Sequence, residues 1–216
     1  MDEIFITTYT YDISLSVLVP QYIEAVSKFL AYMKKLVPKP HLKECGSYLT
    51  QYQENWITLI CDILKSVDHK TINCTELDLK LPYNQLMDAL NIPKHYVHEN
   101  AYYKNIWGPI YWNFLHFTSI LCSKNENLRD RFSTNMLNFN LCMICPNCAF
   151  NFKNKNPFKL MMIMSISNDT ITPMFNLHNI VNSALHKPQY PFEQFLKNYN
   201  ISASNPQKIS LKFIDF

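Results

Sequence analysis

The segment WGPIYWNFLHFTSILC, residues 107–122, decides the fold class. Its dense apolar and aromatic residues predict a long buried helix. Only two glycines, Gly46 and Gly108, occur in 216 residues, whereas a sheet protein with many tight turns needs more residues that accept positive φ. The sequence therefore predicts an all-α fold, with further helices over 126–140, 146–154, 157–164, 173–186 and 190–199.

The first half of the chain is also predicted to be helical. One helix runs from residue 15 to 37 and ends at Pro38-Lys39-Pro40, a second runs from 48 to 67, and a short third begins near Pro82. Because Ile92-Pro93-Lys94 ends that helix, we place a domain boundary near Lys94. This gives an N-terminal helical accessory domain over 1–94 and a second domain over 95–216.

Charge and hydropathy exclude several classes of protein. The 20 basic and 17 acidic residues are spread along the chain, so no basic run is available to neutralise a nucleic-acid backbone. The start lacks the basic and apolar regions of a signal peptide, and no run of 18 apolar residues suggests a membrane span. We expect a soluble protein that does not bind nucleic acid and does not cross a membrane.

Three of the seven cysteines lie in LCMICPNCA, residues 141–149, which holds two overlapping C-x-x-C pairs. If Cys145 caps a helix whose first residue is Pro146, the helix amides and dipole stabilise a thiolate there. A thiol with a lowered pKa is reactive in disulfide exchange. We therefore predict a redox pair, with Cys145 facing substrate and Cys148 on the buried side.

A metal site is the alternative for this cluster. Cys142, Cys145 and Cys148 could bind zinc or an iron–sulfur cluster if a fourth ligand were present. No second C-x-x-C follows, and the nearest further ligands, Cys122 and His178, lie in other predicted helices, so we expect no metal. The other four cysteines are expected to be free buried thiols rather than disulfide partners: Cys45, Cys61, Cys74 and Cys122.

The helix over 173–186 has a clear start, because Thr172 can cap its first amides and Pro173 suits the first helical position. In that register His178 and Asn182 stand one turn apart on one face, with Val181 beside them. A histidine and an asparagine on an otherwise apolar helix need partners.

Three motifs in order resemble the Erv/ALR family of FAD-linked sulfhydryl oxidases. Residues 107–116 resemble its W-G-P-x-x-W-x-x-x-H opening, and residues 145–149 lie where its C-x-x-C belongs. HNIVN at 178–182, with Leu185 and Lys187-Pro188, resembles its H-N-x-V-N-x-x-L-x-K-P signature. The match covers roughly residues 102–199, and a preceding helical domain is similar to the baculovirus-type branch, which implies a large insect DNA virus as the source.

The resemblance implies a bundle of four helices plus a short fifth that binds FAD. Trp112 and His178 would sandwich the adenine, His116 and Asn182 would hydrogen-bond the cofactor, and Gly108 would permit close approach of the backbone. The complete set of implied cofactor-binding residues is Gly108, Trp112, His116, Cys148, His178, Asn179, Val181, Asn182, Lys187 and Tyr190, with Asn179 and Lys187 along the ribose and pyrophosphate.

The activity that the resemblance implies is FAD-dependent oxidation of thiol-containing client proteins, with electrons passed to molecular oxygen to give hydrogen peroxide. A homodimer in the host cytoplasm, nucleus or virion is expected. Pro109 and Ile110 stand where some members place a phosphate-binding arginine, so Lys187 or Lys104 would supply that charge. The alternative is a catalytically inactive helical scaffold, or a zinc-binding interaction protein that uses Cys142, Cys145 and Cys148.

Overall fold

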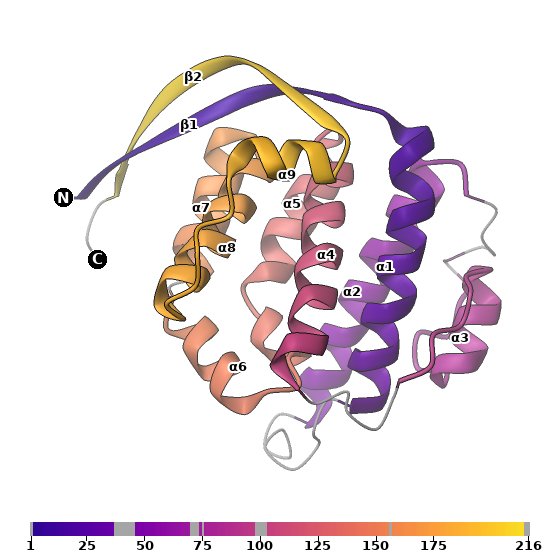
Figure 1. Cartoon of the computed structure of the whole chain (residues 1–216). Helices are drawn as coiled ribbons and strands as arrows, with labels where there is room; N and C mark the ends of the chain where they lie inside the picture. Colours follow the sequence, from indigo (N-terminus) through magenta and orange to yellow (C-terminus); the bar gives the residue numbers. More distant parts are fainter. Residues whose placement is uncertain are drawn as a thin grey trace.

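The computed structural model describes residues 2–36, 46–69, 74, 76–97, 103–155 and 157–213. Its elements are, in order, β1 (Asp2–Ile13), α1 (Leu15–Leu36), α2 (Gly46–Ser66), α3 (Tyr83–Leu90), α4 (Lys104–Cys122), α5 (Glu126–Met136), the 3₁₀ helix η2 (Phe139–Cys142), α6 (Pro146–Lys153), α7 (Pro157–Ser167), α8 (Ile171–Ala184), α9 (Phe192–Asn198) and β2 (Ile201–Phe213) (Figure 1). The prediction of a mainly helical fold is confirmed. No helix in the described part of the chain is long and apolar enough to cross a membrane.

Helix α4 lies at the centre of the bundle and packs against α1, α2, α5 and α8 (Figure 1). Phe29 of α1 stacks on Phe114 of α4 with ring centroids 3.8 Å apart, and Trp56 of α2 meets Phe114 edge-on at 5.5 Å. Such pairs each contribute about 0.5–1.5 kcal/mol beyond the burial of their area. Helices on both sides of Lys94 therefore share one hydrophobic core, and independent folding of residues 1–94 stays a prediction.

The two-stranded sheet was not predicted. β1 pairs antiparallel with β2, from Ile13 opposite Ile201 to Asp2 opposite Phe213, and the ribbon arches over α9 (Figure 1). The scarcity of glycine argued against hairpins with tight turns, but no turn joins these strands. Tyr11 fastens the ribbon to α8, because its hydroxyl lies 2.7 Å from Thr172 Oγ1 in the buried interior.

The predicted cap of α8 is wrong. The helix begins at Ile171, before the expected start. Oδ1 of Asp169 accepts hydrogen bonds from the amides of Ile171 (2.8 Å) and Thr172 (3.1 Å), while Oδ2 accepts from the Thr172 hydroxyl at 2.5 Å. A carboxylate at a helix N-terminus both accepts free amides and meets the positive end of the dipole, so Asp169 takes the role assigned to Thr172.

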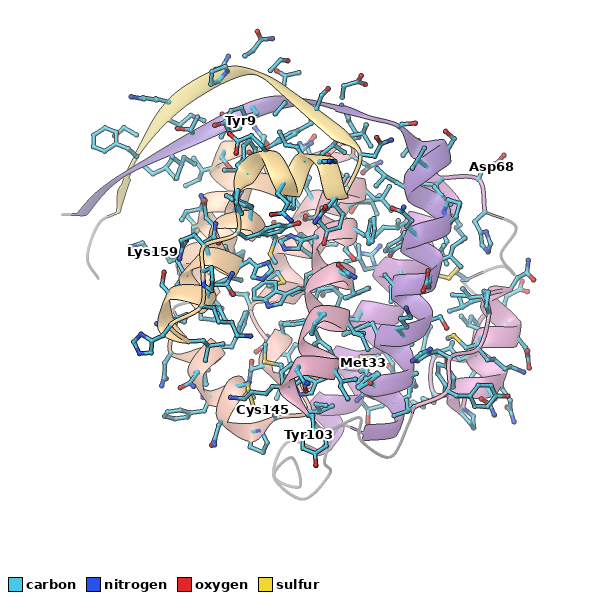
Figure 2. All side chains as sticks on the ribbon, in the orientation of Figure 1. Tyr9, Met33, Asp68, Tyr103, Cys145 and Lys159 are labelled. Atoms are coloured by element: carbon cyan, nitrogen blue, oxygen red, sulfur yellow. A yellow bond between two sulfur atoms is a disulfide. The ribbon has the colours of Figure 1, made fainter. Side chains whose placement is uncertain are left out.

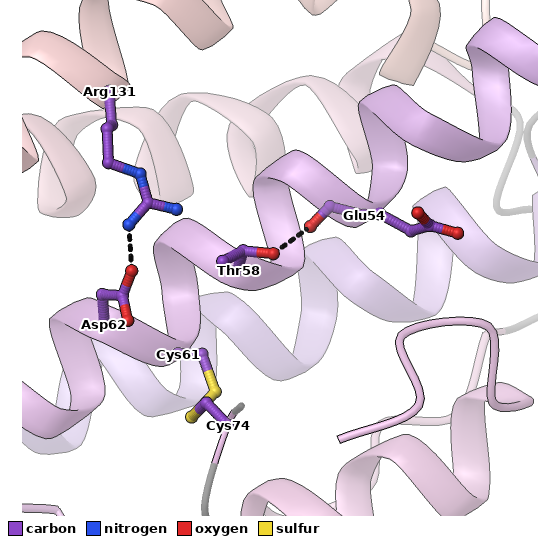
Figure 3. The surroundings of a disulfide bond; sticks show 6 residues. All are labelled: Glu54, Thr58, Cys61, Asp62, Cys74 and Arg131. Carbon is purple, nitrogen blue, oxygen red and sulfur yellow. Dashed lines mark hydrogen bonds and ion pairs between the residues drawn. A yellow bond between two sulfur atoms is a disulfide. The ribbon is translucent and has the colours of Figure 1, made fainter. Parts of the chain in front are cut away.

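A disulfide joins Cys61 of α2 to Cys74, with Cα atoms 6.1 Å apart (Figure 3). The expectation of free thiols is therefore wrong for this pair, because nothing in the spacing of the two cysteines revealed that Cys74 lies next to α2. Beside it, Asp62 forms an ion pair with Arg131 of α5 (Figure 3). Cys122 is a buried free thiol, and Cys45 lies outside the described residues.

Candidate functional site

The paired cysteines lie at the start of α6, as the sequence predicted. Cys145 is the N-cap residue, Pro146 is the first helical residue, and the amide of Cys148 donates to Cys145 Sγ at 3.2 Å. The two cysteines form a disulfide with Cα atoms 5.2 Å apart. When the bond is reduced, the amides and dipole of α6 favour a thiolate at Cys145.

The two sulfurs face different surroundings. Cys148 lines a cavity inside the molecule, and one turn later Phe152 is buried against Phe139, with ring centroids 5.9 Å apart. Cys145 is not among the cavity-lining residues and lies half-buried at the helix end (Figure 2). This arrangement suits an outer Cys145 and an inner Cys148; the chemical roles themselves stay a prediction.

Cys142 is separated from the pair by its environment. It is fully buried, and burial raises the pKa of its thiol well above the usual range. Its carbonyl accepts a 2.6 Å hydrogen bond from the Tyr111 hydroxyl, which holds η2 against α4. Within the described residues, no group of three or more His, Cys, Asp or Glu side chains could hold a metal ion, so the three cysteines do not form a cluster.

A cavity of about 820 Å³ lies between α4, α6, α8 and the segment that leads into α9. Its volume is in the upper part of the range of about 300–1,000 Å³ typical of small-molecule and cofactor sites. Eight residues of the predicted set line it: Gly108, Trp112, Cys148, His178, Val181, Asn182, Lys187 and Tyr190. The structure thus brings residues from all three sequence motifs to one cavity.

Several cavity residues were missed in the sequence. Asn151 and Lys155 line the cavity three and seven positions after Cys148, a spacing that would place them on the same side of a continued helix. Asn113, next to Trp112, also lines the cavity and accepts a 3.0 Å hydrogen bond from the Tyr199 hydroxyl. Helical spacing from Cys148 could have found the first two.

The charge of the cavity is positive. Lys104, Lys155 and Lys187 line it, whereas no Asp or Glu belongs to its described lining. Burial, and to a lesser degree Lys187, lowers the pKa of His178 to about 4. His178 is therefore neutral near pH 7, and the lysines leave the cavity suited to an anionic group.

Trp112 and His178 are stacked directly on each other, with ring centroids 4.0 Å apart and planes inclined by 6°. The structure thus differs from the predicted sandwich, since a third ring between them would need a separation of about 7 Å, twice an ordinary contact. Nδ1 of His178 lies 2.9 Å from Nε2 of His116, so one nitrogen donates to the other. This bond holds the imidazole against the indole, and the adenine sandwich stays a prediction.

Two residues of the predicted set lie behind the cavity surface. His116 is fully buried, and burial followed by the effect of His178 lowers the pKa of its imidazole well below the usual value. Asn179 donates from Nδ2 to the Tyr190 carbonyl at 3.0 Å and accepts at Oδ1 from the Tyr190 amide at 2.7 Å. Neither residue lines the cavity in this structure. His116 positions His178, and Asn179 positions Tyr190.

A model of the Erv1/Alr family matches residues 109–200. These residues, which we call the Erv1/Alr segment, make up less than half of the chain. The Erv1/Alr segment includes most of α4, all of α5 to α9, the cysteine pair and most of the cavity lining.

A curated relative supports the assignment. An FAD-linked sulfhydryl oxidase of African swine fever virus is 29% identical over 101 residues, which cover 44% of this chain and 82% of that protein. No solved structure matches the chain. The likeness is thus to the oxidase family, while β1 and α1 to α3 lie outside the family match.

Gly108, just before the Erv1/Alr segment, indicates how closely a ligand approaches. It lies inside α4 without a positive φ, and a Cβ built on it would meet no atom within 4 Å. Glycine in a helix interior is less favourable than alanine by about 0.5–1 kcal/mol. Neither backbone conformation nor protein packing accounts for this glycine, whereas a ligand against the cavity wall does.

A buried hydrogen-bond donor also indicates that the cavity binds a ligand. Trp107 lines the cavity, and its indole Nε1 is buried without a hydrogen-bond partner in the described part of the chain. Buried polar groups are normally paired, and an unpaired one calls for a partner. The cavity of the Erv1/Alr segment therefore offers an aromatic stack, positive charge, a glycine wall and a free donor, which together fit a large, partly anionic, planar cofactor.

Proposed function

We propose that this chain is an FAD-dependent thiol oxidase that forms disulfide bonds in client proteins and passes the electrons to oxygen, giving hydrogen peroxide. One observation carries the proposal: the Cys145–Cys148 disulfide begins α6, and Cys148 lines the large cavity within the Erv1/Alr segment. The name of the viral relative, an FAD-linked sulfhydryl oxidase, supports both the activity and the cofactor.

The cavity residues suit FAD by their chemistry. Lys104, Lys155 and Lys187 would meet its phosphates, and the exposed side of the Trp112–His178 stack would meet a ring. When bound, FAD accepts two electrons from the reduced cysteine pair and passes them to oxygen. The protein's task is to hold the inner sulfur and the cofactor in one cavity.

The thiol step uses the two cysteines in sequence. A client thiolate attacks Cys145 Sγ and breaks the Cys145–Cys148 bond, and Cys148 leaves as a thiolate. A second client thiolate then attacks the client sulfur of the mixed disulfide, and Cys145 leaves as a thiolate at the start of α6, where the helix amides stabilise it. The client gains a disulfide, and the enzyme pair is reduced by two electrons.

Several finer features belong to the same proposal. Molecular oxygen would be the electron acceptor, the enzyme would work as a homodimer, and its site of action would be the host cytoplasm, nucleus or virion. Client thiols would react with Cys145 directly.

The test is a visible absorption spectrum of the purified protein, before and after dithiothreitol under nitrogen. Flavin bands that bleach with thiol and return with air support the proposal, whereas a colourless protein that releases zinc supports the scaffold alternative. Cys148→Ser should remain yellow and lose turnover, since no inner sulfur remains to reduce the cofactor. The matched control Cys142→Ser should keep turnover; the reverse pattern would assign the chemistry to Cys142 and Cys145.

A further inference from the structure

Helix α6 has two faces that differ sharply in environment. Cys148 and Phe152 point inward, one turn apart, whereas Pro146, Asn147, Phe150 and Lys153 are exposed on the outer side. Phe150 is 65% exposed, so its ring is accessible on the outer side of the helix. We call these four outer residues the α6 face; it begins beside Cys145.

The surroundings of the α6 face are basic. Residues 131–168 contain Arg131, Lys153, Lys155 and Lys159 and no Asp or Glu. Arg131 is paired with Asp62, but no carboxylate among the described residues forms an ion pair with Lys153 or Lys155. The 3₁₀ helix η2, against which α6 packs, has the sequence FNLC and no charge. The positive field beside the disulfide is therefore not cancelled by its own element or by η2.

We propose that the α6 face binds extended, acidic client segments that carry an apolar side chain close to the reacting cysteine. The inference rests on the proposed thiol oxidase function and names its class of substrate. Phe150 offers an exposed aromatic contact, and Lys153 attracts carboxylates. An acidic client segment complements the positive charge around the α6 face, and the face begins beside Cys145, where the client cysteine reacts.

Helix geometry gives the spacing that a client needs. At a rise of 1.5 Å per residue, Phe150 lies about 7–8 Å and Lys153 about 12 Å along the axis from Cys145. An extended peptide advances about 3.3 Å per residue. A client side chain two or three residues from its cysteine therefore reaches Phe150, and a carboxylate about four residues away reaches Lys153.

The experiment compares dithiol peptides that differ only in these positions, using the full chain and measuring kcat/KM for peptide oxidation. A peptide with phenylalanine and carboxylates at the stated spacing should be oxidised about ten-fold more efficiently than its lysine counterpart at low ionic strength, and salt should reduce the difference. Phe150→Ala should remove the preference for phenylalanine, and Lys153→Glu the preference for acidic peptides. Turnover of dithiothreitol should not change in either variant.

Lys65→Glu is the matched control, because it makes the same charge change at an exposed position near the end of α2. The nearby Asp68 lies on the opposite side of the molecule from Cys145 in Figure 2. The control variant should leave peptide selectivity intact. Equal kcat/KM values for the acidic and basic peptides, or a preference that survives Lys153→Glu, would overturn the inference.

Binding is measured separately with fluorescent peptides in which serine replaces cysteine, so that the α6 face is tested without turnover. Tighter binding of the acidic peptide, weakened by Lys153→Glu, supports the inference, and equal binding refutes it. Absence of dithiothreitol oxidation, in contrast, would refute the proposed function alone. The two failures are thus distinguishable.

Discussion

Gly108→Ala should stabilise the flavin-free protein and weaken flavin binding. The glycine lies in α4 without a positive φ, lines the cavity, and has space for a Cβ with no atom within 4 Å. Opposite effects on stability and on binding are expected only where a ligand, and not the protein, requires the glycine.

The magnitudes follow from helix propensity and from packing. Alanine at this position should raise the free energy of unfolding by about 0.5–1 kcal/mol. For a chain of this length, that corresponds to a rise in Tm of about 1–4 °C. If a ligand contacts the backbone there, one added methyl group overpacks the site by about 1–3 kcal/mol and weakens binding about 5- to 140-fold.

The assay uses calorimetry of protein stripped of flavin, together with titration of FAD followed by its fluorescence. Gly108→Leu serves as a graded control, because leucine has a helix propensity close to that of alanine but fills more of the cavity; it should abolish binding and still leave the flavin-free protein folded. A lower Tm for flavin-free Gly108→Ala would show that the protein itself needs the glycine. Unchanged FAD affinity would refute close approach of the cofactor at this wall.

Further changes test other parts of the structure. Cys61→Ser should lower the free energy of unfolding by about 3 kcal/mol under non-reducing conditions, since a disulfide that closes a loop of this length contributes about that much. Denaturant unfolding measures the change, and dithiothreitol oxidation should persist in the variant. A wild-type protein that is equally stable with and without reductant would contradict this prediction. The pKa of His178 is lowered to about 4 in the folded state. Between about pH 4 and 6.5 the unfolded chain therefore binds more protons than the folded chain. The contribution of His178 to stability is complete above this pH window and is lost as the pH falls through it. His178→Gln should flatten this decline in Tm, and an unaltered pH profile would argue against the assignment. Phe29→Ala should lower the free energy of unfolding by about 3–5 kcal/mol. Because Phe29 stacks on Phe114, calorimetry should show the whole molecule unfolding in one transition at a lower temperature. Two separate transitions would instead favour independent domains.

Local features of this protein could be read from the sequence. The observed starts of α1, α5 and α6 and the end of α4 lie close to the predicted helix limits, because helical periodicity and proline positions act over a few neighbouring residues. Cys145 caps α6 for the same reason: Pro146 sets the first helical residue by its own φ. Within each motif, residues one or two helical turns apart lie on the same face of their helix. These residues meet at the cavity.

Only the tertiary structure decided which distant groups meet. β1 pairs with β2, which lies near the other end of the described residues, and Cys74 forms a disulfide with Cys61 of α2. Likewise, His116 bonds to His178 from a helix 62 residues away in sequence, and the ring of His178 lies on Trp112. The spacing of apolar residues predicts which face of a helix is buried. Which elements pack together depends on contacts between residues far apart in the sequence, and no local pattern contains that information.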